Sequence, residues 1–251
     1  MPQLMRTSNP TLNDNAFRSE NAAYGEQSMT VQGTVNKTGV LMLCTLATSA
    51  WTWNMFFHSP NKEAVMPLAA LGGIGGFIVA IVTVFKKNWA PITAPIYALL
   101  EGLILGSISA LFELRFPGIA IQAVSLTFGV MIVMLLLYRA RIIPVTDKLR
   151  IGIVAATGAI ALFYVVQLIL GFFHIQFTTI NSSSPIGIGF SVLVVVIASL
   201  NLVLDFDFIE RGAQFGAPKY MEWYGAFGLM VTLIWLYLEM LRLLSKLRDR
   251  R

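Results

Sequence analysis

Long apolar runs that carry almost no charge follow one another along most of this chain, and they limit its fold more than any other feature. A helix that crosses the hydrocarbon core of a bilayer, which is about 30 Å thick, needs about 20 such residues. None of the runs alternates apolar and polar residues with a period of two, so we do not expect membrane-spanning strands. The seven runs of sufficient length comprise residues 38–57, 65–85, 90–112, 117–138, 151–173, 185–204 and 221–244.

The composition agrees with a lipid environment. Hydrophobic residues make up 56% of the 251 residues and charged residues only 12%, whereas a soluble domain has about 25% charged residues. We therefore predict an all-α membrane protein, a seven-transmembrane-helix bundle whose surroundings are the lipid bilayer. The net charge of +5 is modest, and we interpret it as charge that flanks the spans. We expect no nucleic-acid partner.

The two ends of the chain differ from its apolar part. Residues 1–36 are polar and contain no sustained apolar run, so we predict a flexible N-terminal tail there. Residues 37–245 form the predicted transmembrane domain, and residues 246–251 form a basic C-terminal tail. The first apolar run begins too late for a signal peptide, whose apolar segment follows the first few residues.

Basic residues beside the spans predict the orientation, because such residues collect in cytoplasmic loops. With seven crossings, most of them lie on the side of the N-terminus, which we therefore expect to be cytoplasmic. The basic C-terminal tail disagrees, since it would then lie on the opposite side. Either the last segment does not cross fully or the loops outweigh the tail. The loop residues on the N-terminal side are Lys86, Lys87, Arg139, Arg141, Lys148, Arg150, Arg211 and Lys219.

Glu101 is the acidic residue that lies deepest in an apolar run. It follows the start of its predicted span by eleven residues, which corresponds to about 16 Å of helical rise and a position near the membrane midplane. Because an ionisable group is costly to hold in hydrocarbon, it marks a functional site by default. Glu101 could carry a proton or bind a cation. Alternatively, it could be a protonated side chain that only hydrogen-bonds a neighbouring helix.

A second polar group lies at the end of the sixth span. Residues four apart share a helix face, so Asn201 lies on one face with Asp205, and Asp207 lies on another with Arg211. For Asp207 and Glu210 we favour a solvated helix end, with Asp207 paired to Arg211. Asp205 lies deeper, and both a functional and a structural role are open for it.

Two further acids lie at the ends of the seventh span. Glu222 opens this span on the side where Asp205 emerges, so it could belong to the surroundings of Asp205. Glu239 lies near the far end, too distant for contact with Asp205 in an antiparallel arrangement. We expect Glu239 to pair with Arg242, three residues further on.

Glycines indicate where helices pack closely. Gly72, Gly73, Gly75 and Gly76 in the second span, and Gly102-x-x-x-Gly106 in the third, remove side chains at positions where two helix backbones can approach. We therefore expect tight packing between the second and third spans.

Signatures of common membrane enzymes are missing from the sequence. The two histidines, His58 and His174, lie at span ends, so an intramembrane serine protease would need one of these edge residues as its base. The sequence contains no Walker A motif and no dinucleotide-binding glycine motif. We therefore expect no enzymatic activity and no resident cofactor.

Three stretches carry a resemblance to a known family: residues 201–210 (NLVLDFDFIE), 217–224 (APKYMEWY) and 235–239 (WLYLE). Through them the chain resembles the YccA-type bacterial branch of the Bax inhibitor-1 family. The resemblance implies a bundle with the last helix at its centre, located in the bacterial inner membrane. It also implies a proton-sensitive calcium leak and, in some members, inhibitory contact with a membrane-bound protease or with cell-death regulators.

Better-known members of this family are associated with two carboxyl groups, one in the sixth and one in the seventh span, that share a proton and control the pore. The resemblance places Asp205 at the first position and Thr232 at the second. Since threonine does not titrate, the familiar pair is broken in this chain. Glu101 and Thr232 are predicted to lie at the same depth of about 16 Å. We therefore hypothesise that Glu101 supplies the missing acid and shares a proton with Asp205.

Together these features lead us to expect a proton-sensitive cation leak channel, with calcium as the transported ion and with Asp205 and Glu101 as the proton-sensing and gating residues. Oxygen ligands suit calcium, and we expect at most a weak calcium site at Asp205. The alternative is a non-conducting regulator that binds and inhibits another membrane protein, such as a membrane protease. Further candidates for the ion path or its surroundings are Asn201, Asp207, Glu222 and Thr232.

Overall fold

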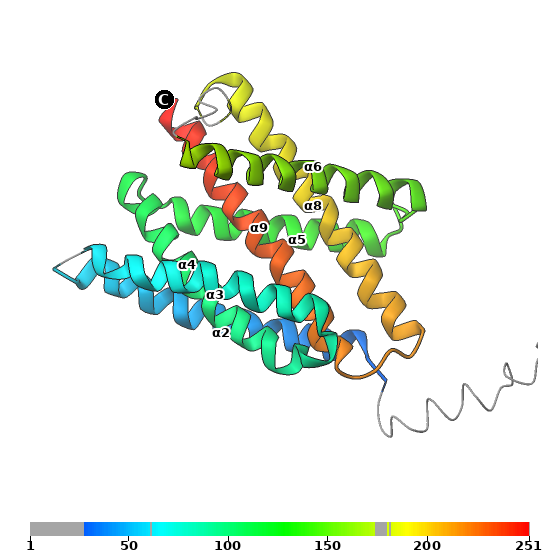
Figure 1. Cartoon of the computed structure of the whole chain (residues 1–251). Coiled ribbons are helices and arrows are strands. Elements are labelled where there is room, and N and C mark those ends of the chain that lie inside the picture. The colour runs from blue at the N-terminus through cyan, green and yellow to red at the C-terminus, as the bar shows by residue number, and fades with distance from the viewer. Residues whose placement is uncertain (1–27, 61, 174–179, 181, 251) are drawn as a thin grey trace, which may run out of the picture.

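A computed structural model describes residues 28–60, 62–173, 180 and 182–250 and confirms the predicted seven-helix bundle. Seven helices in these ranges are long and apolar enough to cross a membrane (Figure 1). Two short 3₁₀ helices, η1 (Lys62–Val65) and η2 (Lys87–Trp89), precede the second and third of them. The seven are α2 (Val31–His58), α3 (Met66–Phe85), α4 (Ala90–Arg115), α5 (Ile119–Arg139), α6 (Asp147–Phe172), α8 (Pro185–Gln214) and α9 (Met221–Asp249).

The last helix, α9, lies at the centre of the bundle, as the family resemblance implied (Figure 1). It packs against α2 and α4, which belong to the first half of the chain, and against α5 and α8. Among the long helices, α3 contacts the bundle mainly through α4, and α6 mainly through α8. The other long helices thus form two groups, one of α2, α3 and α4 and one of α5, α6 and α8, with α9 packed against both. Any rearrangement between the two groups therefore involves α9.

Two apolar clusters hold these groups together. The larger one joins α5, α8 and α9 and includes Leu202, Leu236 and Leu241, all fully buried. The second joins α2, α4 and α9, where the ring of Tyr97 meets Phe227 edge-on with centroids 4.9 Å apart. Many other large apolar side chains are exposed on the outside of the bundle. This distribution fits a protein whose outer surface faces lipid.

Polar caps determine where three of the helices start. Thr30, Thr146 and Ser184 cap α2, α6 and α8 by accepting a hydrogen bond from a backbone N–H group of the first turn. The cap at Thr30 corrects the predicted N-terminal tail, because residues 31–36 already belong to α2. Helix α9 continues to Asp249 and so includes most of the residues assigned to the basic C-terminal tail. In both places polar residues extend a helix because their side chains find partners there.

The close packing predicted for α3 against α4 is confirmed. A Cβ atom on Gly72 would lie 2.5 Å from the carbonyl oxygen of Leu100 in α4. Gly102 and Gly106, however, serve another contact, because Cβ atoms there would overlap threonine side chains of α2. Helix α4 therefore uses one face for α2 and another for α3.

Candidate functional site

Asp205 and Thr232 face each other across the contact between α8 and α9. Asp205 lies nine residues before the end of α8, and Thr232 lies eleven residues after the start of α9. Because the two helices are joined by a short connection, these positions reach the same level. The Asp205 carboxyl group lies beside the Thr232 side chain, whose hydroxyl group donates a hydrogen bond of 3.4 Å to the Gly228 carbonyl oxygen of its own helix. The structure thus brings together the two positions that the family resemblance pairs.

The second carboxylate oxygen of Asp205 has no comparable contact. Oδ2 is buried and makes no hydrogen bond with any residue that the structure describes. Its neighbours on α8, Val203 and Phe206, belong to the apolar core. A buried polar atom without a partner is rare, and gaining a proton, a water molecule or a cation would satisfy it.

Glu101 lies near the middle of α4, but its side chain points toward α3 and not toward Asp205. The Tyr97 hydroxyl group, one turn earlier on α4, lies beside the Glu101 carboxyl group. The carboxylate oxygen Oε1 lies where a Cβ atom on Gly76 of α3 would be only 2.9 Å away. Glu101 therefore lies at the contact between α3 and α4.

The hypothesised pair of Glu101 and Asp205 is not formed. Within the described ranges, the recorded side-chain partner of Glu101 is Tyr97 and that of Asp205 is Thr232, with no contact between the two acids. Helical rise predicts only how deep a residue lies, whereas the rotation of the helix decides which neighbour it meets. Gly102 packs against α2, and this contact turns the preceding residue toward α3.

The polar residues at the end of α8 form a network of ion pairs. Asp207 is only 7% exposed and accepts hydrogen bonds from Arg211 at 3.0 Å and from Arg150 of α6 at 2.5 Å. The predicted pair of Asp207 and Arg211 is thus confirmed, and Arg150 adds a second cation. Glu210 accepts a hydrogen bond from the Tyr138 hydroxyl group of α5. The network ties α5, α6 and α8 together at one end.

Asn201 also contacts α6. Its Nδ2 atom donates to Thr157 Oγ1 at 2.7 Å and to the backbone carbonyl group of Ile197 at 2.9 Å. Asn201 shares a helix face with Asp205, but the hydrogen bonds of its amide group go to α6 and to its own helix. Its observed role is to hold α6 on α8.

Glu222, in the first turn of α9, is fully buried and surrounded by donors. The backbone N–H group and the hydroxyl group of Thr30 donate to Oε1 at 2.9 and 3.0 Å. Glu222 also forms ion pairs with Lys37 of α2 and, at 3.0 Å, with Lys219. A Cβ atom on Gly33 would overlap the carboxylate, so this close approach requires glycine. Glu222 fastens the start of α2 to the start of α9.

Sequence reasoning missed this anchor. Glu222 was expected in the surroundings of Asp205, yet its recorded partners belong to α2 and to the connection before α9. Lys37 and Thr30 precede it by 185 and 192 residues, so no local spacing reveals them. Only Lys219, three residues before Glu222, gave a signal that helical spacing could have detected.

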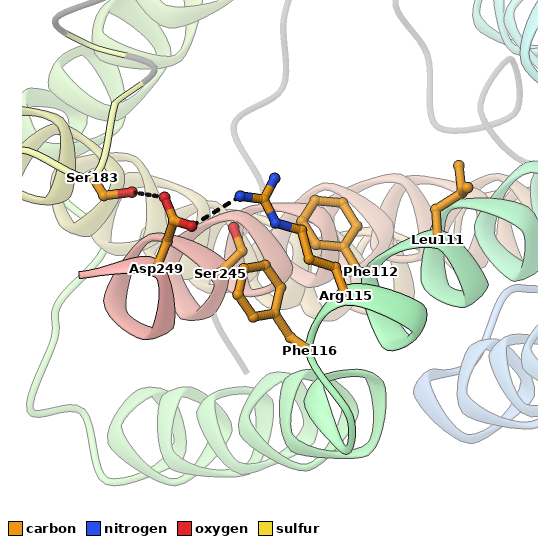
Figure 2. Close-up of a pocket in the computed structure, with 7 residues that line it drawn as sticks. All are labelled: Leu111, Phe112, Arg115, Phe116, Ser183, Ser245 and Asp249. Carbon is orange, nitrogen blue, oxygen red and sulfur yellow. Dashed lines mark hydrogen bonds and ion pairs between the residues drawn. The ribbon is translucent and has the colours of Figure 1, made fainter. Parts of the chain in front are cut away.

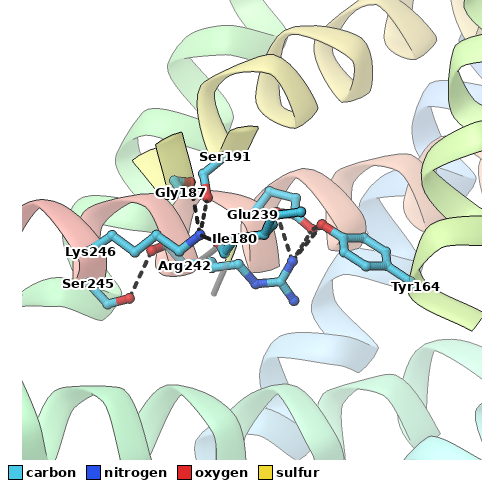
Figure 3. Close-up of polar contacts among 8 residues, drawn as sticks. All are labelled: Tyr164, Ile180, Gly187, Ser191, Glu239, Arg242, Ser245 and Lys246. Carbon is cyan, nitrogen blue, oxygen red and sulfur yellow. Dashed lines mark hydrogen bonds and ion pairs between the residues drawn. The ribbon is translucent and has the colours of Figure 1, made fainter. Parts of the chain in front are cut away.

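The far end of α9 carries a second network (Figure 3). The predicted pair of Glu239 and Arg242 is confirmed, with Nη1 of the arginine 2.9 Å from Oε1 of the glutamate. Tyr164 of α6 lies between the two side chains. It donates its hydroxyl hydrogen to Glu239 at 2.8 Å and accepts a hydrogen bond from Arg242 at 2.6 Å.

Lys246 lies one turn further along α9 and is 5% exposed (Figure 3). Its ammonium group donates to Ser191 Oγ at 2.9 Å and to the carbonyl oxygens of Gly187 and Ile180 at 3.0 and 2.8 Å. These three acceptors match the three hydrogens of an ammonium group. Lys246 therefore fastens the end of α9 to the start of α8.

A hollow of about 320 Å³ lies beside this end of α9 (Figure 2). Its polar lining includes Arg115, Ser183 and Asp249. Arg115 forms an ion pair with one carboxylate oxygen of Asp249 at 2.9 Å, and Ser183 donates to the other at 2.8 Å. Because both oxygens of Asp249 are engaged, the hollow offers no free carboxylate to a cation.

Residues that could hold a metal ion do not gather in one place. No group of three or more His, Cys, Asp or Glu side chains suited to a metal occurs in the described part of the chain. His58 contacts the Asn54 carbonyl group at 3.0 Å, and His174 lies outside the described residues. Calcium takes about six to eight oxygen ligands, so a cation at Asp205 and Thr232 would have to keep most of its water.

Comparison with known proteins identifies the family. The family model described as Bax inhibitor 1 like matches residues 9–249. Searches of curated proteins and of solved structures gave no match. Since the matched segment includes all seven membrane-spanning helices and the contact between Asp205 and Thr232, this chain belongs to the Bax inhibitor 1 like family.

Proposed function

We propose that this protein is a proton-sensitive cation leak, that calcium is the transported ion, and that Asp205 controls the leak. The observation that supports this most directly is the buried Oδ2 atom of Asp205, which lacks a hydrogen-bond partner among the residues described. It belongs to the contact between α8 and the central helix α9. A change in the charge of this group therefore acts on the packing of α9.

The proposed gate depends on the charge of Asp205. A neutral carboxyl group can remain beside Thr232 in apolar surroundings at moderate cost, because it carries no net charge. Without its proton the group becomes an anion that lacks a cationic partner, and such a charge attracts water or a cation into the contact. Hydration then separates α8 from α9 locally and opens a path. In this scheme alkaline conditions favour the leak and acidic conditions close it.

The ends of α9 limit how far this opening extends. Glu222 fastens one end to α2, and Lys246 fastens the other to α8. Movement is therefore expected mainly in the middle of α9, where Thr232 lies.

Calcium flux into liposomes that contain a trapped indicator tests the proposal. Wild-type protein, Asp205→Asn and Glu101→Gln are compared at one acidic and one alkaline pH. We expect the wild type and Glu101→Gln to leak faster at alkaline pH, because the α8–α9 contact is intact in both. Asp205→Asn is expected to give the same rate at both values. A pH response that survives in Asp205→Asn would refute the proposed gate.

The second candidate function is a non-conducting regulator that binds another membrane protein. It is favoured by the contact at the first described residues, where Met29 donates its N–H group to the Ala217 carbonyl oxygen at 2.7 Å and Ser28 pairs with Pro218. This contact holds the start of the described chain beside the α8–α9 connection, where a partner could act on α9. Wild-type flux equal to that of empty vesicles at both pH values would support the regulator and exclude the leak.

We further propose that the start of α2 faces the cytoplasm of a bacterial cell, because basic loop residues gather on that side. The test uses single cysteines in a Cys44→Ser background, since Cys44 is the only cysteine in the chain. A thiol reagent that cannot cross the membrane is expected to label Ser59→Cys in intact cells and to leave Ile142→Cys unlabelled. The reverse pattern would invert the proposed orientation.

A further inference from the structure

An apolar groove of about 570 Å³ lies between α5 and α8, separate from the contact between Asp205 and Thr232. Met134 and Val195 line it and belong to the buried core. Val133 and Val196 also line it, and they are 52% and 50% exposed. The groove therefore extends from the core to the outer surface of the bundle, which faces lipid.

The lining of the groove suits an apolar occupant. Ser199 is one of the few polar residues there, and its hydroxyl group donates to the Val195 carbonyl oxygen of its own helix at 2.7 Å. A hydroxyl group bonded in this way has no hydrogen left for a ligand. Apart from Ser125 at its far end, the groove therefore offers a ligand apolar contact.

Gly129 gives the groove part of its width. A Cβ atom at this position would meet nothing within 4 Å, whereas Gly72 and Gly102 lie directly against a neighbouring helix. The missing side chain at Gly129 therefore creates space and does not serve contact between helices. Protein interiors are densely packed, so space of this size beside the core is expected to be filled in the membrane.

Positive charge gathers near one end of the groove. Ile143, which lines the groove, belongs to the connection between α5 and α6. Arg139, Arg141 and Lys148 are exposed in and around this connection. None of the three forms an ion pair with another residue that the structure describes. An apolar groove beside unpaired cations is complementary to an amphiphile with an anionic head group.

The backbone of Arg141 points to the same conclusion. Its φ angle of 54° lies in the left-handed region, which glycine adopts with less strain. The turn is closed by hydrogen bonds of 3.0 Å from Arg141 N–H to the Tyr138 carbonyl oxygen and from Ile142 N–H to that of Leu137. Glycine would close this turn at lower conformational cost, so what arginine adds at this position is its guanidinium group.

The dimensions match one leaflet of a membrane. Ser125, the first residue of α5 that lines the groove, precedes Arg139 by fourteen residues. This separation corresponds to about 21 Å of helical rise, and one leaflet is about 20–22 Å thick when its head-group region is included. An acyl chain that starts near Arg139 would therefore run along the whole groove.

We propose that the groove binds one acyl chain of an anionic phospholipid, taken from the leaflet on the side of the α5–α6 connection, and that Arg139 and Arg141 bind its phosphate group. Apolar burial holds the chain, and the two guanidinium groups select the charge of the head group. This binding does not depend on whether the protein conducts ions.

Photocrosslinking of the full chain in liposomes tests the site. The probe is phosphatidylglycerol with a diazirine in its acyl chain, present as a minor component in phosphatidylcholine. We expect crosslinks in residues 125–134 and 195–200. Gly129→Leu adds a side chain at a position where a Cβ atom meets nothing within 4 Å, so it should fill the groove, and crosslinking should fall about ten-fold. Gly39→Leu is the matched control, because Gly39 is an equally open glycine on α2, and it should crosslink like the wild type.

A double variant, Arg139→Gln with Arg141→Gln, tests the head group independently of the groove. Its crosslinking by the phosphatidylglycerol probe should fall to the level of a phosphatidylcholine probe with the same diazirine. Equal crosslinking of wild type and Gly129→Leu would overturn the proposal, as would a wild type that does not distinguish the two lipids. A change of oligomeric state in Gly129→Leu, measured by light scattering, would also overturn it by showing that a second copy of the chain covers the groove.

Discussion

The acidic side chains at the two ends of α9 have cationic partners. The acidic side chain beside its middle, Asp205 of α8, forms no ion pair with any residue that the structure describes. At the ends, Glu222 and Glu239 are 0% and 2% exposed, and each lies in an ion pair with at least one cation. In the middle, the Asp205 carboxyl group of α8 lies beside the hydroxyl group of Thr232 and forms no ion pair within the described ranges. Its second oxygen is buried and has no hydrogen-bond partner among the residues that the structure describes.

Because of this difference, we expect substitutions at the ends of α9 and beside its middle to change the stability of the bundle by different amounts. Removing one member of a buried ion pair leaves the other charge uncompensated, which destabilises a protein by about 3–5 kcal/mol. An acid that has no cation nearby supplies no such stabilisation, so changing it costs little. The ends of α9 should therefore determine the stability of the bundle, while the middle can change its charge and hydration.

The largest effect is expected at Glu222. Glu222→Ala leaves Lys37 and Lys219 without their common partner and removes the acceptor for the N–H and hydroxyl groups of Thr30. We expect the free energy of unfolding to fall by about 3 kcal/mol, at the low end of the range because both lysines are partly hydrated. Thermal unfolding in detergent, followed by circular dichroism, measures the change.

A matched pair of glycine variants checks this expectation by a different route. Gly33→Ala places a methyl group where the Glu222 carboxylate lies, whereas Gly39→Ala on the same helix meets nothing within 4 Å. Only Gly33→Ala should lower the melting temperature. Equal melting temperatures for the two would mean that the anchor at Glu222 is looser than the structure shows.

A smaller loss is expected at the opposite end of α9. Arg242→Ala removes the cation paired with Glu239 but leaves the hydrogen bond from Tyr164. We expect a decrease of about 2 kcal/mol in the free energy of unfolding, because one donor still satisfies the buried carboxylate. Arg248→Ala, which removes only exposed hydrogen bonds, is the control and should change stability by less than about 0.5 kcal/mol. Equal losses for the two arginines would contradict the assignment.

Removing one cation from the network at the end of α8 should lower the free energy of unfolding still less. Arg150→Ala removes one of the two cations that hold Asp207, and Arg211 remains. We expect a loss of about 1 kcal/mol, reduced by the partial exposure of both arginines. Hydrogen exchange should become faster at the start of α6, which Arg150 ties to α8. Unchanged exchange there would show that the remaining contacts of α6, including the one with Asn201, hold its start in place without Arg150.

Features set by local spacing could be predicted from the sequence, and features set by helix rotation could not. Runs of apolar residues predicted all seven spans, and spacings of three and four residues predicted the pairs Glu239–Arg242 and Asp207–Arg211. The position of Glu101 near the middle of a long apolar helix was also predicted. Its partner was not, because a rotation of one residue, about 100°, changes which helix a side chain meets.

In the candidate site, too, the sequence predicted contacts between consecutive helices but not contacts between helices that are distant in the chain. The placement of Asp205 opposite Thr232 followed from the family resemblance and from the antiparallel connection of two consecutive helices. The anchor of Glu222 on Lys37 joins the first and last helices, and only the folded bundle shows that these are neighbours. Lys246 was assigned to the basic C-terminal tail beyond the seventh span, whereas its three acceptors on and before α8 hold its ammonium group inside the bundle.

The smallest change in stability is expected at Asp205, and it is the sharpest test of the contrast between the ends and the middle. Asp205→Asn keeps the shape of the side chain and breaks no ion pair, so the free energy of unfolding should change by less than about 1 kcal/mol in either direction. The amide is neutral at every pH, so the melting temperature of the variant should also vary less with pH than that of the wild type. If Asp205→Asn instead destabilised the bundle as much as Glu222→Ala, the carboxylate would have to be held by a strong partner in the membrane. The middle of α9 would then be as firmly fastened as its ends, and opening at Asp205 would lose its physical basis.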